Sequence, residues 1–254
     1  MCSCDDQQMT ALDLRRATVF GQEAQEYHRW RPSYPPEAVD WVVPTGARDV
    51  FDLGAGTGKL TALLARPGLQ VQAAEPDLRM LAVLRRHLPN VKAHHAPAER
   101  LPIADDSLDA VLVADAWHWF PHSQAIAEVR RVLRAGGRLA LIWNTPQLAT
   151  GWTSQVAQFD PDADTRRSAP TPTGLPADDV ETAVFSWDWQ VDAETVAGSL
   201  GTNSAYLRAD PEHRRRHMQH AAEVVTAACQ VAGTPTIPWP QRTTCIRWHP
   251  DRST

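Results

Sequence analysis

Residues 52–58 read DLGAGTG, and this glycine-rich stretch decides which fold the chain can adopt. It ends the short apolar run DVFDL at 49–53, which predicts a buried strand, and it leads into a helical pattern at 59–65. Glycines at such a junction permit positive φ angles and let a ligand come close to the backbone. The stretch therefore predicts the first strand, turn and helix of an α/β sheet that holds a ligand at the turn.

The alternation of strand and helix continues on both sides of this junction. Further strands are predicted at 69–74, 91–95, 107–114, 138–143, 183–191 and 243–248. Further helices are predicted at 17–30, 37–43, 77–88, 121–134, 193–199 and 211–231, and the glycine pair 136–137 is expected to end the fourth of them. Short spacing between alternating elements favours parallel strands with helices on both faces. We predict a Rossmann-like, doubly wound, mostly parallel seven-stranded α/β sheet.

Composition narrows the partners that the chain can have. The 254 residues carry a net charge of −5, which does not favour nucleic acid. The four cysteines form no CxxC pair, which suits a reducing cytosol and predicts a cytoplasmic protein. No uninterrupted apolar segment of about 18 residues is present, so we expect no contact with the membrane interior.

Three histidines have a spacing that deserves a test as a metal site. His213, His217 and His220 share one face of the helix predicted at 211–231. Arginines surround them and no cysteine is near, so we interpret this face as solvated and expect no bound metal.

The spacing of the glycines distinguishes between several known nucleotide-binding motifs. A Walker loop requires Ser or Thr after Gly-Lys, but Leu60 follows Lys59. The dinucleotide motif GxGxxG requires a third glycine where Lys59 stands. The spacing here suits a ligand without a pyrophosphate, and Glu75, at the end of the second predicted strand, could accept hydrogen bonds from ribose hydroxyls. A turn that closes a strand–helix junction and binds nothing is the remaining interpretation.

Several longer segments resemble one enzyme family. The segments are VFDLGAGTGKLT at 50–61, AAEPD at 73–77, APAERLPIADDSLDAVLVADAWHWF at 96–120 and EVRRVLRAGGRLALIWN at 128–144. With the pattern F-x6-Y-x3-RPSYP at 20–35, they resemble class I S-adenosylmethionine-dependent methyltransferases. This pattern and the segments at 192–206 and 240–248 are similar to the small-molecule subgroup that includes trans-aconitate methyltransferase-like enzymes.

The resemblance implies S-adenosyl-L-methionine as the cofactor and assigns its contacts. Asp52 would hold the amino group, Glu75 the ribose hydroxyls, and Pro76 would cover the adenine. Pro97 and the segment TPQ at 145–147 depart from the family's pattern, so the resemblance implies no contacts there. The implied cofactor-binding residues are Asp52, Gly54, Ala55, Gly56, Glu75, Pro76, Ala98, Glu99, Asp115 and Ala116.

The resemblance also implies how the chain is divided. Residues 1–16 are expected to be a frayed tail, and 17–254 a single methyltransferase domain. Its parts are an N-terminal helical cap at 17–47, a cofactor-binding core at 48–145, and a substrate lid with the last strands at 146–254. Within the last part, the segment 160–180 is rich in Pro, Asp and Thr, which suggests a loop or lid.

Methyl transfer is a displacement from a sulfonium, so the enzyme aligns the two partners and removes a proton where the acceptor needs it. His118, in the run AWHWF after the strand at 107–114, is our candidate general base. The opposite interpretation makes AWHWF a packing element. The candidates for lining the acceptor pocket are Tyr27, Tyr34, Trp117 and Trp143.

The sequence thus predicts methyl transfer to an O, N or C nucleophile of a small-molecule acceptor, in specialised metabolism. The 10 Trp, against 5 Phe and 3 Tyr, are compatible with an aromatic or indole-like acceptor, and genome composition would give the same bias. Two alternatives stay open: a protein that binds S-adenosylmethionine without catalysis, and an NAD-type oxidoreductase. These residues determine neither the acceptor nor the oligomeric state.

Overall fold

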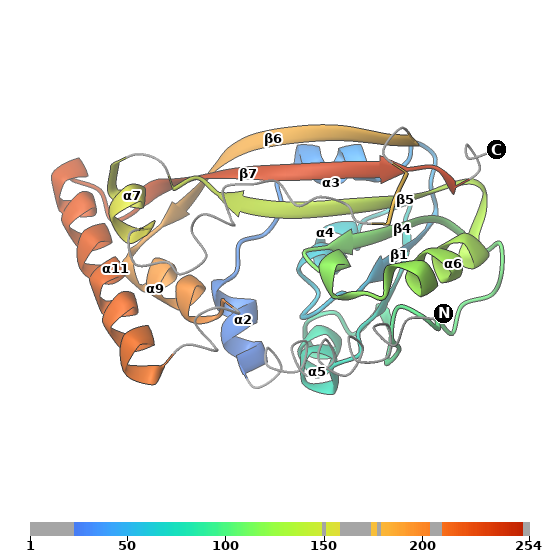
Figure 1. Ribbon diagram of the computed structural model, residues 1–254, viewed down its shortest axis with the longest axis horizontal. Coiled ribbons are helices and arrows are strands. Elements are labelled where there is room, and N and C mark those ends of the chain that lie inside the picture. The colour runs from blue at the N-terminus through green and yellow to red at the C-terminus, as the bar shows by residue number, and fades with distance from the viewer. Residues whose placement is uncertain (1–22, 149–150, 158–173, 177–178, 204–209, 251–254) are drawn as a thin grey trace, which may run out of the picture.

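The computed structural model describes residues 23–148, 151–157, 174–176, 179–203 and 210–250 (Figure 1). One seven-stranded sheet has the order β3-β2-β1-β4-β5-β7-β6. The strands β1 to β5 run parallel, and β7 is antiparallel to both β5 and β6. The predicted Rossmann-like α/β fold is confirmed. The strands are β1 (Asp49–Leu53), β2 (Gln70–Ala74), β3 (Lys92–His94), β4 (Leu108–Ala114), β5 (Leu133–Pro146), β6 (Val180–Val191) and β7 (Ile237–Trp248).

Helices cover both faces of the sheet, because alternate residues of a buried strand point to opposite faces and both faces are apolar here. Val50 and Leu112 belong to the core that contains α3 and α4, whereas Phe51 and Val111 belong to the core that contains α6. Within the described ranges the helices are α2 (Ala24–Trp30), α3 (Pro36–Val42), α4 (Lys59–Leu64), α5 (Leu78–His87), the short 3-10 helix η2 (Trp117–Trp119), α6 (His122–Val132), α7 (Gly151–Ala157), α9 (Ala193–Gly201) and α11 (Pro211–Ala232).

The glycine pair 136–137 lies inside a strand, so the prediction that it ends a helix is wrong. Helix α6 already ends at Val132, and β5 begins at the next residue. Gly136 has φ +77°, and the register of β4 with β5 shifts near this point. The pair therefore marks an irregularity in β5, which a local glycine signal cannot distinguish from a helix end.

The start of β7 was also predicted too late, at 243 instead of Ile237. Two prolines, Pro238 and Pro240, interrupt the strand pattern there. The last register pair between β5 and β7 joins Pro146 to Gln241, and the Gln147 N–H still donates to the Pro240 carbonyl at 2.8 Å, so beyond Pro240 the strand β7 pairs with β6 alone. Proline, which lacks an N–H, is tolerated where a strand has no neighbour on one side.

The far ends of β5, β6 and β7 reach beyond the shorter strands and carry α7, α9 and α11 (Figure 1). A third hydrophobic core holds this region together, and it includes residues of all three helices. Trp239 is at its centre, stacked on Trp189 at 5.8 Å between ring centroids and edge-on to Trp152 at 5.7 Å. The predicted tail 1–16, residues 17–22 of the predicted first helix, and 160–173 and 177–178 of the predicted loop or lid lie outside the described residues.

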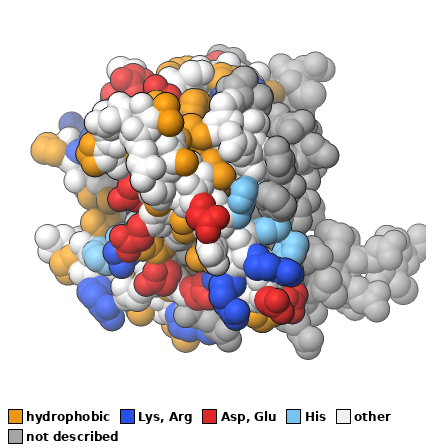
Figure 2. Space-filling view, turned by 90° about the vertical axis from the view of Figure 1, so that its left-hand side faces the viewer, with side chains coloured by type: hydrophobic (Ala, Val, Ile, Leu, Met, Phe, Trp, Pro, Cys, Tyr) orange, Lys and Arg blue, Asp and Glu red, His pale blue; other side chains and the backbone are white. Residues whose placement is uncertain are grey.

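The outer face of α11 mixes charges of both signs. Figure 2 shows this side of the molecule, with acidic, basic and histidine side chains interspersed. His217 is buried, with its ring centroid 3.9 Å from that of His213, so the expectation of a fully solvated histidine face is wrong. The described residues contain no cluster of three or more potential metal ligands. Nor does that part of the chain contain a helix both long and apolar enough to span a membrane.

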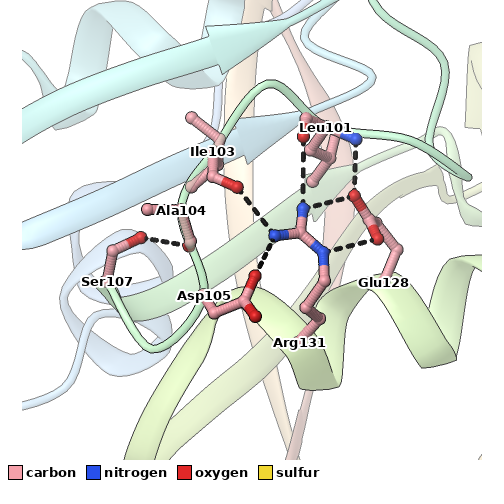
Figure 3. A network of polar contacts seen from close by, with 7 residues as sticks. All are labelled: Leu101, Ile103, Ala104, Asp105, Ser107, Glu128 and Arg131. Atoms are coloured by element: carbon pink, nitrogen blue, oxygen red, sulfur yellow. Dashed lines mark hydrogen bonds and ion pairs between the residues drawn. The ribbon is translucent and has the colours of Figure 1, made fainter.

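Arg131 on α6 ties down the loop that leads into β4 (Figure 3). Its guanidinium donates to the Ile103 and Leu101 carbonyls at 2.8 and 3.2 Å, to Asp105 at 2.5 Å and to Glu128 at 2.6 and 2.9 Å. Glu128 in turn accepts the Leu101 N–H at 2.6 Å. One side chain thus fixes a loop about 30 residues away in sequence.

Replacing Arg131 by methionine is expected to lower the free energy of unfolding by about 2 kcal/mol, because it removes charge-assisted hydrogen bonds and leaves Glu128 without its cation. The side chain is 32% exposed, so solvent limits the loss. Arg66→Met is the matched control, since the pair of Arg66 with Asp40 is exposed and should contribute less than about 1 kcal/mol. Urea unfolding measures both variants, and equal losses would contradict the role of the network.

Candidate active site

The carboxyl ends of the parallel strands face α2 and the C-terminal helices. In Figure 1 the arrowhead of β5 points toward the side where α7, α9 and α11 lie, and β1 and β4 run parallel to β5. The glycine turn after β1 and the segment after β4 therefore share this edge. In doubly wound sheets this is the edge at which ligands bind.

The three glycines of the turn have different surroundings. Gly54, Gly56 and Gly58 all have positive φ, at +71°, +56° and +88°. A Cβ on Gly54 would meet Ala116 and Phe120 at 2.9 Å, whereas a Cβ on Gly56 would meet nothing within 4 Å. Gly54 is needed for packing within the protein, while Gly56 leaves open space that a ligand could fill.

Glu75, at the end of β2, is bound to this turn. Its Oε2 accepts the Gly56 N–H at 2.8 Å and its Oε1 accepts the Asp77 N–H at 2.9 Å. Burial raises the pKa of the carboxyl to about 7, although both backbone donors lower it. Each oxygen keeps a further lone pair, so the carboxylate can still accept hydrogen bonds from a ligand.

Asp52, near the end of β1, is fully buried. Its Oδ2 accepts the Thr61 hydroxyl at 2.5 Å, while its Oδ1 has no partner in the described part of the chain. Burial raises the pKa of Asp52 to about 7. Thr61 was not among the predicted site residues, although its position in the first turns of the helix after the glycines was a usable signal.

Asp115 joins the N-terminal segment to the end of β4. It has φ +50°, which is unusual for a residue other than glycine. Its Oδ2 accepts the Tyr34 hydroxyl at 2.6 Å. Burial raises the pKa of Asp115 to about 6, opposed by Tyr34 and by the nearby Arg31 cation. Burial and the proximity of Asp115 raise the pKa of Tyr34 well above its usual value.

The N-terminal segment is also attached to β5, and two of its own side chains contact each other. The Asn144 amide of β5 donates to the Ser33 carbonyl at 2.9 Å. Arg31 places its guanidinium 5.2 Å from the centroid of the Tyr27 ring. Burial raises the pKa of Tyr27, and the Asp115 and Glu75 carboxyls act in the same direction. The structure therefore brings both tyrosines that were predicted in this segment to the carboxyl edge.

Three predicted cofactor contacts come from the loops after β2 and β3, and a fourth from the residue after Asp115. The Pro76 carbonyl accepts a hydrogen bond from His95 Nε2 at 2.9 Å. Ala98 is 4% exposed, Ala116 is 9% exposed, and Glu99 is half-buried. Their contacts with a cofactor stay a prediction.

His118 is exposed on η2, and its ring centroid lies 4.6 Å from that of Trp119. Partial burial and the nearby His122 lower its pKa. The groups that oppose the effect of burial on the pKa of Asp115 are Tyr34, Arg31 and the Asn144 backbone.

Trp117 and Trp143 lie in the main core. They are 1% and 3% exposed, and Trp117 packs edge-on to Phe120 and stacks with His122. The packing interpretation of AWHWF therefore fits Trp117, and His118 is the member of the run that faces solvent.

Known proteins resemble this chain in sequence and in fold. A domain profile described as a methyltransferase domain matches residues 51–141. An uncharacterised methyltransferase of Mycobacterium tuberculosis H37Rv is 39% identical over 244 residues, which cover 94% of this chain and 98% of the relative. The solved structure of a proposed type II methyltransferase from Anaeromyxobacter dehalogenans has a TM-score of 0.65 and 27% identity, over 85% of this chain and 96% of that one. Demethylmenaquinone methyltransferase of Thermus thermophilus is 34% identical over 136 residues, 51% of this chain and 58% of the relative.

The sheet order, the glycine turn and the acidic residue after β2 define a class I methyltransferase. The chain belongs to this S-adenosylmethionine-dependent methyltransferase family, since its likeness to the mycobacterial relative covers nearly both chains. This assignment sets aside the NAD-type oxidoreductase and the non-catalytic binding protein. The comparisons do not single out the trans-aconitate-like subgroup, which stays a prediction.

Proposed function

We propose that the protein transfers a methyl group from S-adenosyl-L-methionine to an O, N or C nucleophile of a small molecule, at the carboxyl edge of the sheet. The observation that carries this proposal is the open space over Gly56, next to a buried carboxylate held by the Gly56 N–H. A ligand that lies on the backbone there and donates hydroxyl groups to Glu75 would use both features.

The residues at this edge fit the parts of the proposed cofactor. The cofactor supplies an activated methyl group on a sulfonium. Glu75 would accept hydrogen bonds from the ribose, and the unpartnered Oδ1 of the buried Asp52 would accept one from the amino group. Asp115 would add negative charge near the amino acid end, and Tyr27 and Tyr34 would keep water from that end.

We propose His118 as the general base for acceptors that must lose a proton. Its lowered pKa keeps the imidazole neutral near pH 7, the state in which it can accept a proton. The high tryptophan content gives little support for an aromatic acceptor, because Trp117, Trp143, Trp239 and Trp248 are buried packing residues. The proposal therefore leaves the acceptor class open within small molecules.

Calorimetric titration with S-adenosylmethionine and S-adenosylhomocysteine tests the proposal. We expect micromolar affinity, about −8 kcal/mol, for both ligands. NAD in the same cell is the control and should bind at least about 100-fold more weakly, since the turn lacks the third glycine of the dinucleotide motif. No heat and no thermal shift with either methyltransferase ligand would overturn the cofactor assignment.

The affinity for S-adenosylmethionine is expected to rise about 10-fold from pH 6 to pH 8. A group with a pKa of about 7, as Glu75 has, changes from roughly one-tenth to nine-tenths ionised over this range. Hydroxyl donors favour the ionised form, so binding should release a proton. In the ligand-free protein the sign is opposite: the raised pKa of Glu75 makes its contribution to stability fall as pH rises from about 4.5 to 7.

Titration in buffers of different ionisation heat measures the released proton. Glu75→Gln should lower the wild-type proton release by about half a proton at pH 7 and by nearly one at pH 6, while Asp52, with a similar pKa, can still contribute. An affinity that falls with pH, or an unchanged proton release in Glu75→Gln, would show that the ligand does not bind this carboxyl.

A further inference from the structure

A series of side-chain hydrogen bonds crosses the sheet from β6 to the N-terminal segment. The Trp187 indole N–H of β6 donates to the Thr243 hydroxyl of β7 at 2.8 Å, and that hydroxyl donates to Oδ1 of Asn144 on β5 at 2.6 Å. The Asn144 amide in turn donates to the Ser33 carbonyl at 2.9 Å, across 111 positions of sequence. We call Trp187, Thr243 and Asn144 the relay, because each is joined to the next and the last is joined to the N-terminal segment.

The register of the strands places the relay on one face of the sheet. Thr243 is paired with Asn144 on one side and with Phe185 on the other, and Trp187 follows Phe185 by two residues. Residues directly opposite each other, and residues two apart along one strand, share a face. This is the face that α3 covers, since Phe185 packs against the core that contains residues of α3. The relay therefore ends at the segment 31–35, which leads from α2 into α3.

The donors and acceptors of the relay fit in one direction only. An indole nitrogen can only donate, so the Thr243 oxygen accepts from Trp187 and its single proton is left for Asn144. That proton meets Oδ1, so the NH2 group of Asn144 faces the Ser33 carbonyl. Thr243 is fully buried, so water does not readily replace a lost partner. The relay thus fixes the orientation of the Asn144 amide.

Asn144 joins the relay to the proposed cofactor site. Its side chain holds Ser33, and the next residue, Tyr34, donates its hydroxyl to Asp115 at 2.6 Å. The backbone of Asn144 also makes a hydrogen bond that lowers the pKa of Asp115 against the effect of burial. Asn144 is therefore in contact with both ends of the Tyr34–Asp115 pair, one through its side chain and the other through its backbone.

We propose that Trp187, Thr243 and Asn144 position the segment 31–35 for the binding of S-adenosylmethionine. They act through Ser33 on Tyr34, and none of them is required to touch the cofactor or the acceptor. This role rests on the proposed function, which supplies the identity of the ligand. It gives β6, a strand at the edge of the sheet, an effect on a site formed by the ends of the parallel strands.

Thr243→Val and Thr244→Val form a matched pair for the test. Thr243→Val keeps the shape of the side chain but removes the acceptor for Trp187 and the donor for Asn144. Thr244 is the next residue of β7 and is also buried, but its hydroxyl has no hydrogen-bond partner within the described part of the chain. In calorimetric titration Thr243→Val should bind S-adenosylmethionine about 10-fold more weakly than wild type, and Thr244→Val should bind it normally. Thr243→Ser keeps the hydroxyl and should restore most of the affinity.

A double-mutant cycle with Tyr34→Phe tests whether the relay acts through the N-terminal segment. Tyr34→Phe removes the hydrogen bond to Asp115. If Thr243 acts by positioning Tyr34, adding Thr243→Val to Tyr34→Phe should weaken binding less than about 3-fold further, instead of about 10-fold. Additive losses would overturn the inference.

Trp187→Phe is the second variant of the relay. Trp187 is half-buried, and phenylalanine keeps an aromatic ring there while removing the N–H donor. We expect about 3-fold weaker binding of S-adenosylmethionine in the wild-type background and almost no further loss in Thr243→Val. Circular dichroism and thermal melting establish which variants are folded, and Trp187→Phe decides the outcome if Thr243→Val does not fold.

Hydrogen–deuterium exchange of the ligand-free protein separates the failure of this inference from the failure of the proposed function. Backbone amides of residues 31–43 should exchange about 10-fold faster in Thr243→Val than in wild type or Thr244→Val, because the segment opens more often once Ser33 is released. Equal effects of the two valine variants, no recovery in Thr243→Ser, or faster exchange with unchanged affinity would overturn the inference. If wild type bound no S-adenosylmethionine, the proposed function would fail, and the exchange rates would still decide whether the relay holds the segment.

Discussion

Replacing Gly56 by valine is expected to weaken S-adenosylmethionine binding about 100-fold or more, roughly 2.7 kcal/mol, while the protein stays folded. A Cβ at this position meets no protein atom within 4 Å, so the branched side chain projects into the space proposed for the ligand. The residue also has φ +56°, a conformation that strains a β-branched side chain by about 1–3 kcal/mol. That strain would shift the N–H that Glu75 accepts.

Gly46→Val separates the loss of space for the ligand from the effect of backbone strain. Gly46 has φ +80° and open space around its Cα, as Gly56 does, but it precedes β1 at the opposite edge of the sheet. Both variants should therefore lose similar stability in thermal melts, and Gly46→Val should bind the cofactor normally in calorimetry. If a folded Gly56→Val protein bound S-adenosylmethionine with normal affinity, the ligand would not occupy the open space at Gly56.

Replacing His118 by alanine is expected to slow methyl transfer about 10²- to 10⁴-fold, with cofactor affinity nearly unchanged. His118 follows Asp115 by three residues and is the exposed member of η2, whereas its neighbour Trp117 is buried. Its lowered pKa keeps it unprotonated near pH 7. An acceptor that ionises by itself should need the base less as pH rises, so the deficit should then shrink.

Single-turnover rates with methyl-labelled cofactor and a responsive acceptor, from a panel of phenols, amines and carboxylates, measure this effect across pH. His122→Ala is the control, because it keeps His118 but removes the neighbouring imidazole that lowers its pKa. We expect a rate close to wild type and a pH profile displaced toward higher pH. Wild-type rates in both His118→Ala and His118→Gln would leave His118 only a structural part of η2.

The cofactor-binding half was predictable because its signals are local. Mostly apolar runs of five and seven residues define β1 and β4, and the glycines follow β1 directly. The limits of β5 and β7 were missed, because glycine and proline break a pattern in sequence without breaking a strand whose neighbours accommodate them. Gly136 sits in the irregular start of β5, and Pro238 in the part of β7 that pairs on one side only.

The sequence by itself determined the succession of strands and helices along the chain, the glycine turn and the residues that mark the methyltransferase family. Each of these depends on neighbours within a few positions. Only the tertiary structure decided which side chains meet. Tyr34 and Asp115 are 81 positions apart, and Arg31 and Thr202 are 171 apart, so no local pattern could pair them. Packing likewise distinguishes two glycines of one motif: Gly54 lies against other residues of the protein, whereas Gly56 faces open space. The physical reason is that propensity and periodicity act along the chain, whereas burial and unsatisfied donors arise only when distant segments fold against one another.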